Sequence, residues 1–244
     1  KKLILQINFW YCFFSDYNIK IHFNSEEHGI SNVIKQIAIK KLESCSIGKC
    51  RSAPQKIENY WFGFYPNDVF FVWGTDSGNS IMRSTNFFKH VIISGYPYQQ
   101  SKNQFEEIFL VKNELANQGV KFTLLLTDGS YSNNKSSTHQ LFPNDQMSKY
   151  LNYFLRILIE EKEMGLIIKS KKPGYLSSLN GIKELLQKAK ETKRVYIFDN
   201  LGLEPKSFSK IVDFAIGTSV DFPSSIIQLA IYGSKCAIYD YSNF

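Results

Sequence analysis

The second half of the chain alternates short apolar runs with segments whose apolar residues recur at helical spacing. The apolar runs lie at 122–129, 165–174, 195–200, 214–219 and 236–241. After the first run, apolar residues three and four positions apart predict a helix with a single apolar face. These residues are Met147, Tyr150, Leu151, Phe154, Leu155, Leu158 and Ile159. Five strands separated by four helices predict an α/β fold with a parallel, doubly wound sheet and right-handed crossovers.

The other connecting segments carry helix signals of their own. Asn180 is placed to be the N-cap of a helix, and Pro205 suits the first turn of the next one. Their inward residues would be Ile182, Leu185, Leu186 and Ala189, then Phe208, Ile211 and Val212. The last helix opens with Pro223-Ser224-Ser225 and precedes the final strand.

The first half of the chain is less regular. Apolar residues at positions 30, 33, 34, 37 and 38 predict a helix. Residues 44–67 are rich in Ser, Gly, Pro and aromatic residues, and we expect a loop there. The runs 68–74 and 90–98 predict strands that flank a short helix.

A domain boundary is expected where Gly95 and Pro97 interrupt the pattern, before an amphipathic segment at 105–119. We expect a partial N-terminal α/β domain at 1–97 and a Rossmann-like domain at 98–244.

The first residues, KKLILQINFWYCFF, superficially mimic a signal peptide. No small-residue cleavage site follows, and the run is too short to span a bilayer, so we expect a buried strand or the edge of a helix. The chain has no initiator methionine and ends shortly after an apolar run. We therefore expect a piece of a longer protein.

The composition is that of a globular protein, with 43% hydrophobic and 21% charged residues. The net charge of +7 suits an anionic partner, such as a phosphate-bearing small molecule, an anionic membrane surface or nucleic acid. No basic stripe interleaved with aromatic residues appears, so nucleic acid is not the expected partner. The four cysteines suit neither a disulfide scaffold nor a zinc site, and reduced thiols favour the cytoplasm.

Ligands of open α/β sheets bind beyond the carboxyl ends of the strands, so the residues that follow each predicted strand are the candidates. In strand order they are Asp128 with the long polar loop 130–145, then Lys169, Lys171 and Lys172, then Asn200, Leu201 and Gly202, then Gly217, Thr218 and Ser219. The helix that opens at Pro223 would add free N–H groups, the positive end of its dipole and two serine hydroxyls. A phosphate suits such a helix start, and Lys169 would supply the countercharge.

Less specific interpretations account for the same residues. Pro-Ser-Ser is good helix-start chemistry at helices that bind nothing, and the lysines equally suit a solvated strand end. A cluster in the first half, His22, Glu26, Glu27 and His28, is the densest source of a catalytic base, although solvated side chains explain it as well. No second set of ligands supports a metal site there. The chain has no dinucleotide fingerprint, P-loop or nucleophile elbow.

Six runs, in order, resemble glycosyltransferases of the two-Rossmann-domain (GT-B) type. They are VFFVWG, VIISGYPY, FTLLLTDG, LIIKSKK, FAIGTS and PSSIIQLAIYGSKCAIYDY. The resemblance is closest to proteins of bacterial capsular or other surface polysaccharide biosynthesis, including lipopolysaccharide. It covers approximately residues 60–244, extends loosely to NIKIHFNSEE, and lies in pattern and order rather than in a diagnostic motif.

The resemblance implies that the C-terminal domain binds a nucleotide-sugar donor and the N-terminal domain binds the acceptor. Ser224 and Ser225 would hold the donor diphosphate and Lys169 would neutralise it, with Thr218 and Ser219 in the same phosphate site.

The nucleotide base would meet the loop of Asn200, Leu201 and Gly202. Many relatives place a Glu in the final helix to grip the donor ribose. Gln228 is the nearest candidate here, and it can bond a hydroxyl but carries no charge.

We therefore expect a metal-independent, cofactor-free glycosyltransferase that moves a sugar from a nucleotide-sugar to a surface polysaccharide or a lipid-linked glycan, with Glu27 and His28 as candidate catalytic residues. Two alternatives stay open: a non-catalytic nucleotide-sugar-binding or scaffold protein, which Gln228 favours, and a CDP-polyol phosphotransferase of the same architecture. The expected location is the cytoplasm, and the basic charge leaves peripheral association with the inner membrane face open.

Overall fold

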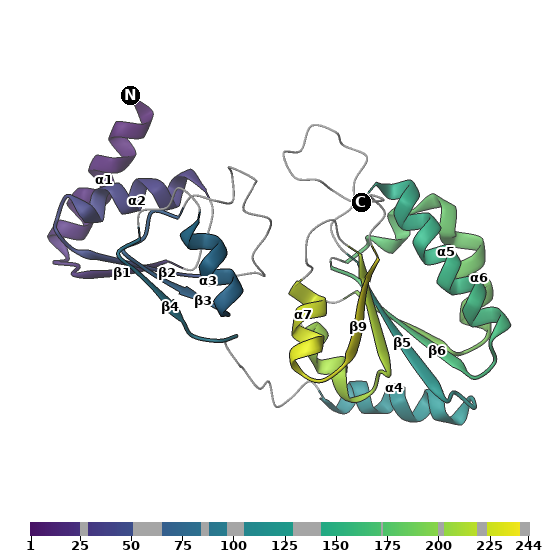
Figure 1. Cartoon of the computed structure of the whole chain (residues 1–244). Helices are drawn as coiled ribbons and strands as arrows, with labels where there is room; N and C mark the ends of the chain where they lie inside the picture. The colour runs from purple at the N-terminus through teal and green to yellow at the C-terminus, as the bar shows by residue number, and fades with distance from the viewer. Residues whose placement is uncertain are drawn as a thin grey trace. The chain divides into compact units, whose positions relative to one another are not determined.

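The computed structural model describes residues 1–24, 29–50, 65–83, 88–96, 105–128, 143–171, 173–199, 203–218 and 224–239. The chain divides into two compact units, residues 1–99 (unit 1) and 100–244 (unit 2). Each unit has its own parallel sheet (Figure 1). The expected boundary at residue 97 lies outside the described residues.

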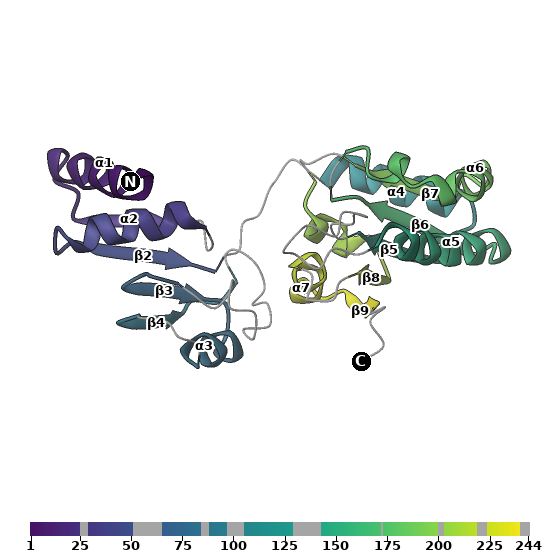
Figure 2. The ribbon, with the colours of Figure 1, turned by 90° about the horizontal axis from the view of Figure 1, so that it is seen from above.

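Unit 1 is a four-stranded parallel sheet in the order β1-β2-β3-β4. Its elements are α1 Lys2–Asp16, β1 Ile21–Asn24, α2 Ile30–Lys40, β2 Cys45–Lys49, β3 Val69–Val72, α3 Thr75–Met82 and β4 His90–Ile93. Helix α1 lies along α2, as Figure 2 shows, because Phe14 packs against Ala38 and Ile39.

Strand β2 corrects the expectation of a loop at 44–67. Ser46 is fully buried, and its backbone N–H and hydroxyl both donate to Asp68 Oδ2, at 2.9 and 2.7 Å. A Cβ added to Gly48 would lie 2.7 Å from the Asn67 side chain and 2.8 Å from that of Phe70. Because neighbouring side chains crowd this strand, it needs small residues and lacks the apolar run that identifies a strand in sequence.

The two helices of unit 1 that pack together also differ from expectation. The first segment is a helix with Phe14 as its only buried residue, rather than a buried strand or helix edge. In α2, Ile30 and Ile37 of the expected apolar face are exposed, whereas Asn32 and Gln36 are buried. Gln36 Nε2 donates to Asn32 Oδ1 at 3.3 Å, so two polar side chains partly satisfy one another inside the unit.

Unit 2 has the predicted parallel sheet, with β5 at its centre in the order β7-β6-β5-β8-β9. Its helices and strands are α4 Phe105–Asn117, β5 Phe122–Thr127, α5 Asn144–Glu160, β6 Met164–Lys169, η1 Leu176–Ser178, η2 Asn180–Ile182, α6 Lys183–Glu191, β7 Val195–Phe198, η3 Pro205–Lys210, β8 Phe214–Thr218, α7 Ser224–Ile231 and β9 Lys235–Tyr239. The prediction of five parallel strands is confirmed.

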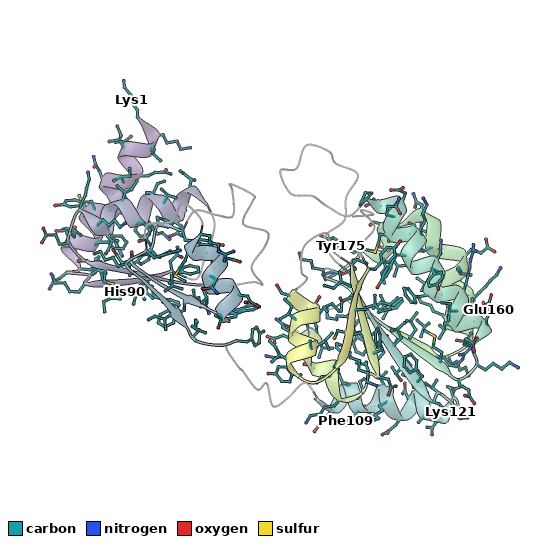
Figure 3. All side chains as sticks on the ribbon, viewed as in Figure 1. Lys1, His90, Phe109, Lys121, Glu160 and Tyr175 are labelled. Carbon is teal, nitrogen blue, oxygen red and sulfur yellow. The ribbon has the colours of Figure 1, made fainter. Side chains whose placement is uncertain are left out.

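The central strand of unit 2, β5, is mostly apolar and is buried from Thr123 to Thr127 because both faces of the sheet are covered. Leu126 enters the core on one face together with Leu151 of α5. Leu125 enters the opposite core with Ile108 of α4 and Ile226 of α7. We call these the α5 face and the α7 face. Figure 3 shows side chains of α4 and α5 on opposite sides of the sheet.

Two expected helices of unit 2 take a different form. The segment that begins at Pro205 is the 3-10 helix η3, and Ile211 and Val212 follow it, although both still enter the core on the α7 face. The helix expected to have Asn180 as its N-cap is α6, which begins only at Lys183 and has no side-chain cap on its first turn. Asn180 instead opens the 3-10 helix η2.

Candidate functional site

The candidate site lies where the order of the strands reverses in unit 2. From β5 the chain builds β6 and β7 on one side, then crosses to build β8 and β9 on the other. The carboxyl ends of β5 and β8 therefore adjoin each other with crossovers that leave in opposite directions. Such a switch point is where open α/β sheets bind ligands.

Three residues share the α7 face at this edge. Thr127, the last residue of β5, is in register with Lys169 on one side and with Gly217 on the other. Residues paired across parallel strands face the same way, and Leu125, two positions earlier, packs on the α7 face. Thr127, Lys169 and Gly217 therefore form one row beneath the start of α7.

Gly217 allows α7 to approach this row closely. A Cβ added there would lie 2.3 Å from Ile226 Cγ1 and 3.0 Å from Thr127 Oγ1. Real Cβ atoms do not make contacts of 2.3 Å, so any side chain at position 217 would push α7 or β5 aside. The glycine thus holds the start of α7 against the end of β5.

The start of α7 brings a serine hydroxyl to the same row. Ser225 Oγ lies 3.1 Å from Thr127 Oγ1. The first turn of α7 carries no acidic residue, so no carboxylate of the helix itself offsets the positive end of its dipole. The hydroxyl that accepts in this pair can donate to an anion together with the N–H groups of the helix start.

Lys169 supplies a cation to this row from inside the protein. Its side chain is only 6% exposed, and Nζ donates to the Ser170 carbonyl at 2.7 Å. Burial lowers the pKa of Lys169, while the negative charges of Asp128 and Asp199 oppose that shift. A desolvated ammonium group interacts strongly with an anion that reaches it.

Asp128 stands next to this cation and faces the other way. The carboxyl is 8% exposed, and Oδ1 accepts a hydrogen bond from the Lys171 backbone N–H. Oδ2 is buried without a hydrogen-bond partner among the described residues. Burial is the largest effect and raises the pKa of Asp128 to about 7. The hydrogen bond from the Lys171 N–H and the charge of Lys169 oppose this rise, and the N–H is the stronger of the two.

The remaining described candidates occupy the same edge. Thr218 ends β8 and is fully buried, and Ser224 is the first residue of α7. Gln228, one turn further along α7, is half-buried, and its Oε1 finds no hydrogen-bond partner in the part of the chain that is described. The structure thus gathers Lys169, Thr218, Ser224 and Ser225 at one edge, with Gln228 behind them.

The other predicted site residues lie outside the described residues. These are Glu27, His28, Asn200, Leu201, Gly202 and Ser219.

Thr127 joins the site although it was not among the candidates, and Asp128 and Gly217, which were candidates as residues that follow strands, had no role assigned to them. Each stands at the carboxyl end of an apolar run, which was the available signal. Their role depends on the strand order, because Thr127 meets Ser225 across 98 positions of sequence.

The described residues hold neither a cluster of metal ligands nor a membrane-spanning helix. No group of three or more His, Cys, Asp or Glu side chains there could hold a metal ion. None of the helices in the described ranges is sufficiently long and apolar to cross a membrane.

Solved structures share this fold at low sequence identity. The S. aureus MnaA–UDP co-structure is 12% identical, with a TM-score of 0.56 over 89% of this chain and 58% of that chain. A putative UDP-N-acetylglucosamine 2-epimerase from Listeria monocytogenes is 10% identical, with a TM-score of 0.60 over 96% and 60%. A glycosyltransferase from Rickettsia africae is 11% identical, with a TM-score of 0.56 over 97% and 62%.

These similarities confirm the predicted α/β, GT-B-like fold with two parallel sheets. The chain spans about three fifths of the length of each of these structures. No protein-family model and no curated protein matches the chain.

Proposed function

We propose that this chain is part of an enzyme that uses a nucleotide-sugar, and that unit 2 binds the donor diphosphate at the Thr127–Lys169–Ser225 row. The observation that carries the proposal is the 3.1 Å approach of the Thr127 and Ser225 hydroxyl oxygens beside a buried lysine in register with Thr127. Hydroxyl donors and a desolvated cation suit phosphate oxygens. The fold shared with a UDP complex supports the proposal that the bound phosphate belongs to a nucleotide.

In this proposal the row acts on the leaving group. When the bond between the sugar and the diphosphate breaks, negative charge develops on the diphosphate. Lys169 and the hydroxyls of Thr127 and Ser225 are held in place before the reaction, so they stabilise that charge without rearranging. Neither a metal nor a cofactor enters the scheme.

The rest of the donor would extend from the row over neighbouring residues. Thr218, Ser219 and Ser224 would add phosphate contacts. The base would lie at the loop of Asn200, Leu201 and Gly202, and Gln228 would bond a ribose hydroxyl.

The acceptor would be a surface polysaccharide or a lipid-linked glycan bound by unit 1, with Glu27 or His28 as the base that activates its hydroxyl. The net charge of +7 supports docking at an anionic inner membrane face, where lipid-linked acceptors lie.

A thermal-shift panel of UDP, GDP, CDP, CMP and ADP tests the donor site. A nucleotide at 100 times its Kd stabilises the folded state by about 2.7 kcal/mol, which raises the melting temperature by several degrees. Ser225→Asp places a negative charge in the row and should abolish the shift. Asn113→Asp adds the same charge on an exposed position of α4 and should leave the shift intact. If no nucleotide stabilises the chain, the proposal of a donor site in this row is wrong.

The product of turnover distinguishes the reaction. A glycosyltransferase releases a nucleoside diphosphate, whereas a CDP-polyol phosphotransferase releases CMP. A sugar nucleotide with inverted stereochemistry would identify an epimerase, a second candidate that the fold shared with a putative 2-epimerase favours. Binding without any of these products would identify a binding or scaffold protein.

A further inference from the structure

Asp128 is fixed in place but incompletely bonded. Its Oδ1 is held by the Lys171 backbone N–H, so the carboxyl cannot turn away from the strand edge. Its Oδ2 and the hydroxyl of fully buried Ser170 both lack hydrogen-bond partners within the described part of the chain. The Ser170 hydroxyl nevertheless lies near enough to lower the pKa of Asp128. A proton on the Asp128 carboxyl would therefore have the Ser170 hydroxyl oxygen nearby as an acceptor.

The charges that face Asp128 come mainly from the end of β6. Lys169 and Lys171 lower its pKa, and Lys171 is exposed to solvent. From α5, the buried phenol of Tyr150 faces Asp128, and Tyr239 of β9 faces Tyr150 in turn. Tyr150 donates its hydroxyl hydrogen to the Ile216 carbonyl at 3.1 Å, so it is not oriented to donate to the carboxylate.

Lys169 is therefore shared between two anions once a ligand binds. In the chain alone, its charge helps to keep Asp128 ionised, and Asp199 also interacts with it. A diphosphate in the Thr127–Lys169–Ser225 row would take Lys169 as its own counter-ion and would add negative charge beside Asp128. Both effects favour the neutral form of a buried carboxyl.

We propose that Asp128 takes up one proton from solvent when a diphosphate binds to this row, so that binding of the donor is coupled to pH. The proton is added to Oδ2, and the neutral acid donates it to the Ser170 hydroxyl oxygen. The inference rests on the proposed donor site.

The ionisation of Asp128 near neutrality makes this coupling measurable. With a pKa of about 7, the carboxyl is half ionised at pH 7, so uptake there approaches about 0.5 proton per ligand. Above that pH the affinity should fall by up to about tenfold per pH unit, because each bound ligand must bring a proton with it.

Isothermal titration of the full chain with UDP-N-acetylglucosamine measures the uptake directly. Both phosphates of this probe are esterified, so it lacks the terminal phosphate that titrates near pH 6. The binding enthalpy in two buffers of different ionisation heat gives the number of protons taken up. Should another nucleotide bind more tightly in the thermal-shift panel, its sugar derivative replaces this probe.

Asp128→Asn is the decisive variant because it mimics the protonated acid. It should abolish the uptake and, at pH 8, bind the probe several-fold more tightly than the unmodified chain. A carboxylate that merely supported the structure would weaken binding when replaced. Asp199→Asn is the matched control, because it removes an exposed carboxylate near the same lysine and should retain the uptake.

The outcomes separate the two proposals. Binding without proton uptake by the unmodified chain, or uptake that persists in Asp128→Asn, overturns the role of Asp128 and leaves the donor site standing. Absence of binding by every sugar nucleotide overturns the donor site and this inference together. If Asp128→Asn does not fold, the two-buffer titration of the unmodified chain still decides the question.

Discussion

Thr127 Oγ1 and Ser225 Oγ lie 3.1 Å apart and join the end of β5 to the start of α7. Either hydroxyl can donate to the other, and the one that accepts can still donate its own O–H to an anion. The contact is specific to the strand order, since β5 and β8 must be neighbours for α7 to begin beside Thr127.

Thr127→Val should weaken nucleotide binding without unfolding the chain. Valine keeps the shape of threonine but removes the hydroxyl, and a hydrogen bond to a charged group contributes about 1.5–3 kcal/mol, which corresponds to a loss of roughly 10- to 100-fold in affinity. Titration calorimetry measures the change. Thr123→Val, on the same strand and the same face, is the control and should bind normally. Equal affinity for the Thr127 variant and the unmodified chain would remove Thr127 from the site.

Gly217→Ala should destabilise unit 2 and displace α7. The added methyl would lie 2.3 Å from Ile226 Cγ1, and such overpacking destabilises by about 1–3 kcal/mol. Urea unfolding followed by far-UV circular dichroism measures the loss, and nucleotide affinity should fall with it. Gly78→Ala is the matched control, because a Cβ added to Gly78 would lie 3.4 Å from its nearest neighbouring atom, Val72 Cγ2.

A second substitution tests the cause of that effect. Ile226→Ala removes the atoms that the new methyl would meet, so the double variant should be less destabilised than the sum of the two single variants. Strict additivity would mean that the clash with Ile226 is not the reason.

The sequence predicted unit 2 well because its signals are local. The central strands β5 and β6 are mostly apolar and almost fully buried, and burial on both faces requires such runs. The phosphate candidates followed from the rule that ligands bind beyond strand ends, which needs only the positions of the strands.

Unit 1 was harder to predict because its buried positions are polar or small. Ser46 and Gly48 of β2 are buried or crowded without being apolar, and Asn32 and Gln36 take the place of aliphatic residues in α2. Such residues fit only because of neighbours distant in sequence, such as Asp68 for Ser46. No periodicity in a short window contains that information.

The guanidinium of Arg194 connects the carboxyl end of α5 to the sheet through hydrogen bonds. Arg194→Lys should therefore destabilise unit 2. Its guanidinium donates to the carbonyl oxygens of Glu161, Met164 and Leu158, at 2.5, 2.7 and 2.8 Å. A lysine cannot reproduce that planar fork, and leaving a buried carbonyl unbonded costs about 1–3 kcal/mol. Urea unfolding followed by circular dichroism gives the change in unfolding free energy.

The control for Arg194 is a lysine whose ion pair is at the surface. Lys188→Met breaks the exposed pair with Glu184 on α6 and should leave the unfolding midpoint unchanged. If Arg194→Lys were as stable as Lys188→Met, the three carbonyl contacts would contribute nothing to folding.

Asp68 should make the stability of unit 1 depend on pH. Burial raises its pKa, but the Ser46 hydroxyl and N–H and the charge of Lys89, 3.2 Å away, together bring the pKa below its ordinary value of 3.8. A group whose pKa is lowered by folding stabilises the folded state fully above its unfolded pKa, and that stability is lost as the pH falls through the folded pKa. The contribution of Asp68 is therefore complete at neutral pH, begins to fall near pH 3.8 and is lost as the pH drops through the lower pKa of the folded state.

Asp68→Asn tests this because it keeps one acceptor oxygen and removes the charge. At about pH 6 the variant should be less stable by about 1.5–3 kcal/mol, and the difference should shrink as the pH is lowered toward 3. Tryptophan fluorescence reports on unit 1 alone, because Trp10, Trp61 and Trp73 all lie in it. Asp16→Asn, at an exposed position in α1, should show no such dependence. A difference between the Asp68 variant and the unmodified chain that stayed constant with pH would mean that the lost hydrogen-bond geometry, and not the charge, causes the destabilisation.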